Sequence, residues 1–246
     1  MAKLHISNTI DEVLSSLAEY FINSASESIA EKGSFTVALS GGSSPKRLYA
    51  LLSSSPYKER VEWDKLFFFF GDERYVPATD DASNFLMADK ILFEPLKIVG
   101  EKIFAVDTML PPNEAASKYM ENINNHFGGN PPAFDLVLLG LGDNSHTASL
   151  FPHTPILQEQ EATVKAVFLD DQQLYRISFT APLINLAKRV AFLVYGEAKA
   201  EAVYHTLEDE KNPDEFPAQL IEPKNGMLEW FLDRSAAAQL IYSNPD

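Results

Sequence analysis

The feature that most constrains the fold is a series of short apolar runs that have no polar face. Leu66 to Phe70 is apolar throughout, and most of the other runs are apolar on both faces as well. Such strands are typical of a parallel sheet that is covered on both sides. The runs predicted to form strands are Phe35 to Leu39, Leu66 to Phe70, Phe134 to Leu139, Val164 to Leu169, Ile177 to Thr180, Val190 to Tyr195 and Gln239 to Tyr242.

Segments with helical periodicity lie between several of these runs. The first, Thr9 to Lys32, opens with a capping-box pattern and is followed by Gly33, which would end it. The other predicted helices are Pro45 to Leu52, Asn84 to Leu92, Glu114 to Phe127 and Glu197 to Leu207. This alternation predicts an α/β fold: a doubly wound, Rossmann-like, mainly parallel sheet with helices on both faces. A length of 246 residues suits one domain over residues 1–246.

Composition excludes several classes of protein. The formal net charge of −15 argues against nucleic acid or an anionic membrane as a partner, because a polyanion requires a basic surface. The chain has no cysteine, so disulfides and thiol chemistry are excluded. No apolar run is long enough to span a bilayer, and the N-terminus lacks the apolar core of a signal peptide, so we expect a cytoplasmic protein.

The turn after the first predicted strand is suited to an anion. It reads Ser40-Gly41-Gly42-Ser43-Ser44-Pro45, and Pro45 would begin a helix. Glycines let backbone N–H groups turn inward, and a helix N-terminus favours negative charge, so a phosphate can bind there. The alternative is a plain strand-to-helix turn, because the motif is neither a Walker A loop nor a dinucleotide fingerprint.

Three consecutive charged residues follow the most apolar run. They are Asp72, Glu73 and Arg74, at the end of a strand where ligands bind in open α/β sheets. Arg74 can donate several hydrogen bonds to phosphate, and Asp72 or Glu73 can orient a hydroxyl or move a proton. The alternative is an ion pair that covers the strand end.

A histidine lies in a polar turn after another apolar strand. His146 follows Gly140 and Gly142, and a neutral imidazole there can accept a proton near neutral pH.

Two cations, Arg176 and Lys199, adjoin later strands. Lys199 is in the first turn of a predicted helix, where a cation opposes the helix dipole unless an anion is near. For these two residues and for His146 the alternative is a solvated surface position.

Together and in order, these motifs resemble the 6-phosphogluconolactonase family. The resemblance covers nearly the whole chain and is most specific in the His146 motif. The segments that carry it are Ser40-Gly41-Gly42-Ser43, Asp72-Glu73-Arg74-Tyr75-Val76-Pro77, His146-Thr147-Ala148-Ser149-Leu150-Phe151-Pro152, Gly196-Glu197-Ala198-Lys199 and Trp230-Phe231-Leu232-Asp233.

The resemblance implies hydrolysis of 6-phosphogluconolactone to 6-phosphogluconate in the oxidative pentose phosphate pathway, without a metal or organic cofactor. We expect a monomer or a small homo-oligomer, and the sequence does not decide between the two. His146 would take a proton from water and return one to the ring oxygen. The implied substrate-binding residues are Gly41, Gly42, Ser43, Ser44, Asp72, Arg74, Asn144, Arg176 and Lys199. The group that stabilises the oxyanion is not identified by the sequence.

This chain departs from the family at the two residues before the histidine, where Asn144-Ser145 replaces the usual Asp-Gly. Asn144 would keep a hydrogen bond to the imidazole but remove a charge that raises its basicity, for which Asp143 could compensate. A left-handed backbone at Ser145 would be strained.

Two other functions are compatible with parts of the pattern. One is a glucosamine-6-phosphate deaminase, with Asp72 as the enolisation base, but the carboxylate that follows the histidine in that family is absent here. The other is a sugar-phosphate-binding regulator without catalysis, which the presence of Asn144 keeps open although no DNA-binding segment is visible.

Overall fold

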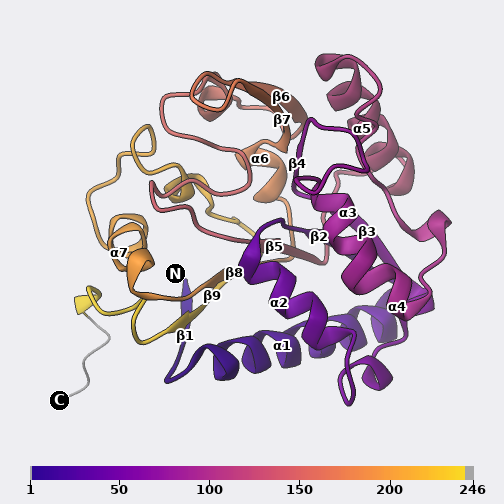
Figure 1. Cartoon of the computed structure of the whole chain (residues 1–246), viewed down its shortest axis with the longest axis horizontal. Coiled ribbons are helices and arrows are strands. Elements are labelled where there is room, and N and C mark those ends of the chain that lie inside the picture. The colour runs from indigo at the N-terminus through magenta and orange to yellow at the C-terminus, as the bar shows by residue number, and fades with distance from the viewer. Residues whose placement is uncertain (1, 242–246) are drawn as a thin grey trace.

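In residues 2–241, which the computed structural model describes, a central sheet of six parallel strands runs through the molecule (Figure 1). Its order is β1-β9-β8-β5-β2-β3. The strands are β1 (Lys3–Ser7), β2 (Phe35–Leu39), β3 (Leu66–Phe70), β5 (Leu136–Leu139), β8 (Arg189–Val194) and β9 (Met227–Asp233). The predicted mainly parallel sheet is therefore confirmed.

Helices cover both faces of this sheet, as predicted for a doubly wound fold. One hydrophobic cluster joins the sheet to α1, α2 and α3, and a second joins the opposite face to α5, α6 and α7. The helices are α1 (Ile10–Lys32), α2 (Ser43–Leu52), α3 (Asn84–Ala88), α4 (Glu94–Leu96), α5 (Pro112–His126), α6 (Ala181–Ile184) and α7 (Ala200–Leu207). None of the described helices is both long and apolar enough to cross a membrane.

Helix boundaries follow the local chemistry closely. Thr9 and Glu12 form the predicted capping box at the start of α1, and Gly33 ends the helix with a left-handed φ of 81°. Helix α2 begins at Ser43, two residues before the predicted start at Pro45, because the turn after Gly42 is already helical. The predicted helix from Asn84 to Leu92 starts as expected but changes to a π-helical turn over Asp89–Phe93.

A second, three-stranded antiparallel sheet lies beside the first. It consists of β4 (Asp72–Arg74), β7 (Leu174–Phe179) and β6 (Val164–Leu169), in that order. Two of the predicted strands therefore belong to a separate hairpin. Only the short turn 170–173 joins β6 to β7, and such a turn can connect antiparallel strands but not parallel ones.

The prediction was wrong at the C-terminal end of the chain. Residues 239–241 form a turn and irregular structure instead of a strand, and Tyr242 lies outside the described residues. The last strand within residues 2–241 is β9, whose apolar pattern is interrupted by the buried Glu229. Because Glu229 accepts a hydrogen bond from His5 of the neighbouring β1, this polar residue is satisfied inside the sheet.

The topology brings several loops to one edge of the sheet. Strands β8, β5, β2 and β3 are neighbours and parallel, so their carboxyl ends lie side by side. The segments that leave them are 40–44 after β2, 71–74 after β3, 140–151 after β5 and 195–199 after β8. These four segments contain all of the predicted site residues except Arg176, which lies on β7 of the second sheet.

Candidate active site

A cavity of about 270 Å³ lies at this edge of the sheet and brings the predicted residues together. Of the predicted site residues, those that line it are Gly41, Gly42, Ser43, Ser44, Asp72, Arg74, His146, Arg176 and Lys199. Asn144 does not line the cavity; its side chain contacts His146 instead. Among residues 2–241, no group of three or more histidine, aspartate or glutamate side chains is arranged to hold a metal ion.

The glycine turn presents the start of α2 to the cavity. Gly42 is the N-cap residue with a left-handed φ of 101°, and no side chain caps the helix. The first N–H groups of α2 are therefore available to an anion. Gly41 is required for another reason: a Cβ atom there would lie 1.8 Å from Asn84 Oδ1.

Two arginines lie opposite each other beside the glycine turn. Arg74 on β4 and Arg176 on β7 are directly paired across the antiparallel ladder, an arrangement that is unfavourable for like charges. Their guanidinium groups donate to neutral oxygens, Arg74 Nη1 to Ala82 O at 2.7 Å and Arg176 Nη2 to Gln172 Oε1 at 2.5 Å. In the described part of the chain both Nε atoms are buried without a hydrogen-bond partner. The pair therefore retains positive charge that a bound anion would neutralise.

Lys199 is held at the cavity by an acidic neighbour. It ends the 3₁₀ turn Glu197–Lys199 that precedes α7, and its Nζ atom lies 2.6 Å from Asp143 Oδ1. Asp143 is largely exposed. Asp143 therefore does not take the place of a carboxylate at position 144, because it bonds Lys199 and not His146.

His146 is fixed by three neighbours. Its Nδ1 atom lies 2.5 Å from Asn144 Oδ1, and its ring stacks on Phe151 with 4.0 Å between ring centroids. The ring also packs on Gly142, where a Cβ atom would be 2.0 Å from His146 Nδ1. With the amide oxygen as acceptor, Nδ1 carries the proton and Nε2 keeps its lone pair.

The electrostatic surroundings keep this imidazole neutral. Burial, with smaller contributions from Lys199 and Arg176, lowers the pKa of His146 to about 4 against the opposing effect of Asp72 and Asp143. Near pH 7 the ring is therefore an available proton acceptor, although a weak one.

The backbone before His146 is strained, as the sequence predicts. Ser145 has a φ of 58°, in the region that favours glycine, and its side chain is buried. Its Oγ donates to Ala202 O of α7 at 3.3 Å, and its carbonyl accepts the N–H of Ala218 at 2.9 Å. The contacts to α7 and to Ala218 hold the left-handed backbone of Ser145, which positions the imidazole.

The two acidic residues after β3 have different environments. Asp72 is buried beside the cavity, and its Oδ2 accepts a hydrogen bond from Ser149 Oγ at 2.7 Å. Glu73 accepts the backbone N–H groups of Asn84 and Phe85 at the start of α3. Burial raises the pKa of Glu73, and these N–H groups oppose that rise. Asp72 therefore lines the cavity, whereas Glu73 stabilises the start of α3.

Sequence reasoning did not single out Asn84 and Gly142 as residues that shape the site. The Asn84 side chain packs on Gly41 and donates to the Asp72 carbonyl at 2.9 Å, which ties the glycine turn to the acidic turn. Gly142 provides the space for the imidazole. The only signal in the sequence was a glycine four residues before the histidine, and a glycine in a turn is too common to be informative.

Comparison with known proteins shows the family to which the chain belongs. The family model for glucosamine-6-phosphate isomerases/6-phosphogluconolactonase matches residues 8–230. A 6-phosphogluconolactonase of Synechocystis is 40% identical over 218 residues, which are 87% of this chain and 88% of the relative. One of Haemophilus influenzae is 38% identical over 206 residues, covering 83% and 87%.

Solved structures of such proteins have the same fold as this chain. The 6-phosphogluconolactonase from Trypanosoma cruzi superimposes with a TM-score of 0.87 at 27% identity, covering 98% of this chain and 97% of that one. A monomeric glucosamine-6-phosphate deaminase, at 21% identity and a TM-score of 0.81, shares the fold, with coverage of 96% and 99%. The chain therefore belongs to the family of glucosamine-6-phosphate isomerases and 6-phosphogluconolactonases.

Proposed function

We propose that this protein hydrolyses 6-phospho-D-glucono-1,5-lactone to 6-phospho-D-gluconate, the lactone-opening step of the oxidative pentose phosphate pathway. The observation that carries the proposal is a single cavity with a neutral imidazole beside a group of cationic and N–H donors. A phosphorylated ester substrate needs both features. The 6-phosphogluconolactonases to which the chain is similar support the choice of substrate.

The cationic part of the cavity would hold the phosphate. Arg74 and Arg176 would supply guanidinium donors, and Lys199 would exchange its bond to Asp143 for one to the phosphate. The N-terminus of α2, with Gly41, Gly42, Ser43 and Ser44, would contribute backbone and hydroxyl donors. Holding the remote phosphate fixes the lactone carbonyl near the imidazole.

His146 would then carry both proton transfers. Nε2 takes a proton from water as the water oxygen bonds to C1, which gives a tetrahedral oxyanion and an imidazolium. When the oxyanion collapses, the bond from C1 to the ring oxygen breaks, and the imidazolium returns its proton to that oxygen. Asn144 would act through His146 by holding Nδ1–H, and not by contact with the substrate.

Phosphate binding would also strengthen the base. Lys199 and Arg176 lower the pKa of His146, and both lie where the phosphate is proposed to bind. A dianion there offsets their charge and favours the imidazolium that forms during the reaction. A lactone without phosphate would thus lose binding energy and meet a weaker base.

The experiment that tests the proposal compares three substrates with the purified protein. We expect 6-phosphogluconolactone to be opened well above its spontaneous rate and glucono-1,5-lactone at least about a hundredfold less efficiently, because the charged phosphate contacts are lost. Deamination of glucosamine-6-phosphate is not expected, since residues 147–151 contain no carboxylate. Equal rates with the two lactones would contradict the phosphate site. If neither lactone opened faster than it does spontaneously, the proposed hydrolysis would be refuted, and binding of a sugar phosphate would be the remaining function.

A further inference from the structure

Two buried tyrosines make the same unusual contact at the ends of adjacent strands. The Tyr49 hydroxyl donates to the carbonyl of Ser40 at 2.8 Å and accepts the N–H of the same residue at 2.9 Å. The Tyr119 hydroxyl accepts the N–H of Phe70 at 2.7 Å and donates to its carbonyl at 3.2 Å. Because a hydroxyl is both donor and acceptor, each phenol takes the place of a neighbouring strand for one residue.

Both contacts occur where the sheet ends and the site begins. The last paired residues of β2 and β3 are Leu39 and Phe70. Ser40 is the first residue after β2, next to Gly41, and Phe70 lies two residues before Asp72. Each phenol therefore holds the backbone at the point from which a turn departs into the cavity.

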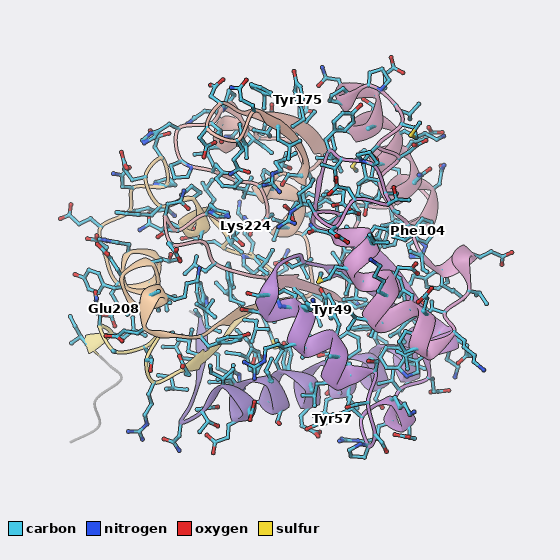
Figure 2. The ribbon with its side chains drawn as sticks, viewed as in Figure 1. Tyr49, Tyr57, Phe104, Tyr175, Glu208 and Lys224 are labelled. Atoms are coloured by element: carbon cyan, nitrogen blue, oxygen red, sulfur yellow. The ribbon has the colours of Figure 1, made fainter. Side chains whose placement is uncertain are left out.

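The two tyrosines approach from opposite faces of the sheet. Tyr49 lies on α2, where Figure 2 labels it, and belongs to the same hydrophobic cluster as α1. Tyr119 lies on α5 and belongs to the cluster on the other face. Each ring is buried to 2% exposure or less, so neither hydroxyl could exchange its partner for water. The identical double contact thus arises independently on the two sides.

The phenols also remain donors over the whole physiological range. Burial raises the pKa of Tyr49, and the nearby Asp72 adds to the effect. Burial likewise raises the pKa of Tyr119, with a contribution from Glu73. Both phenols are therefore protonated throughout the neutral pH range, and neither contact depends on pH there.

We propose that Tyr49 and Tyr119 are positioning residues for the two substrate-binding turns: Tyr49 sets the phosphate-binding turn 40–44, and Tyr119 sets the turn 71–74 with Asp72 and Arg74. Neither hydroxyl needs to contact the substrate. The consequences for catalysis rest on the proposed function, whereas the consequences for the backbone do not.

Amide hydrogen exchange tests the positioning without any substrate. In Tyr49→Phe, exchange should become faster in residues 40–44 and stay unchanged in 71–74; in Tyr119→Phe the reverse is expected. Tyr20→Phe is the matched control, because Tyr20 lies on α1 and packs against Phe231, away from both turns. Unchanged exchange, or faster exchange in both turns of every variant, would overturn the proposal.

Kinetics provide the second readout. Tyr49→Phe should raise KM and the dissociation constant of 6-phosphogluconate by about tenfold with kcat changed less than about twofold. Tyr119→Phe should raise KM and the dissociation constant of 6-phosphogluconate by a similar factor, since it displaces Arg74, which is proposed to hold the phosphate. Wild-type KM and kcat in both variants would overturn the proposal.

A measurement on the wild type keeps the test decisive if a variant does not fold. The amides of Ser40 and Phe70 should exchange as slowly as that of Val37 inside the sheet, and rapid exchange would contradict the phenol contacts. If the wild type shows slow exchange but neither binds nor opens the lactone, the proposed function fails while the positioning stands.

Discussion

The substitution Asn144→Asp places a carboxylate beside the imidazole of His146, and its effect can be calculated. Asn144 Oδ1 lies 2.5 Å from His146 Nδ1, so a carboxylate would have its charge centre roughly 4 Å from that of the imidazolium. With an effective dielectric constant of about 20, the attraction is about 4 kcal/mol, or about three pKa units. Asn144 is exposed, and screening reduces this to roughly one to two units.

The assay is the pH dependence of kcat/KM, which reports the pKa of the free enzyme. Burial lowers the pKa of His146 to about 4 in the wild type. Below that pH the imidazole is protonated and cannot act as base, so activity should fall there. In Asn144→Asp the fall should occur at roughly pH 5 to 6. The NMR titration of the His146 ring should move by the same amount.

Asp143→Asn is the matched comparison. Asp143 raises the pKa of His146 only weakly and bonds Lys199 instead, so its removal should leave the acid limb at or slightly below its wild-type position. If Asn144→Asp shifted the acid limb by less than about 0.3 units, Asn144 would not be the partner of the catalytic imidazole, and the assigned geometry would be refuted.

Three further outcomes follow from the same geometry. Arg74→Ala or Arg176→Ala should each weaken 6-phosphogluconate binding by about 1.5–3 kcal/mol, which calorimetry would show as a Kd about 10- to 150-fold higher. An unchanged Kd would show that the substituted arginine does not bind the phosphate. Gly142→Ala should lower kcat about a hundredfold while the fold persists, because its Cβ would lie 2.0 Å from His146 Nδ1; wild-type kcat would show that the ring does not need that space. Relative to His146→Gln, the unfolding free energy of the wild type should rise by about 3 kcal/mol between about pH 4 and pH 6.5. In that range the unfolded histidine binds a proton that the folded one does not, so a rise in pH favours the folded state. If urea titrations gave the same difference between the two proteins at every pH in this range, the prediction would be contradicted.

The elements that lead into the site were predictable because each carries a local signal. Strand β3 was predicted at its observed boundaries from its unbroken apolar run, and the capping box fixed the start of α1. The four polar turns could be assigned to one edge of the sheet because parallel strands place their carboxyl ends together. What was predictable is thus the part of the structure that depends on periodicity and on turn chemistry.

The contacts that tune the site could not be predicted in this way. Arg74 and Arg176 become neighbours only because β4 pairs with β7 in a separate sheet, and no sequence pattern specifies that pairing. Asp143 and Asn144 are adjacent in sequence, yet one bonds Lys199 and the other holds His146. Such choices depend on side-chain directions set by the strained turn at Ser145, which is a property of the tertiary structure.

The most direct measurement is the rate of opening of freshly generated 6-phosphogluconolactone, recorded above its spontaneous hydrolysis for the wild type and His146→Ala together. We expect strong acceleration by the wild type, almost none by the variant, and similar affinity of both proteins for 6-phosphogluconate, because the phosphate-binding residues are intact. Turnover by His146→Ala at the wild-type rate would contradict the assignment of the base.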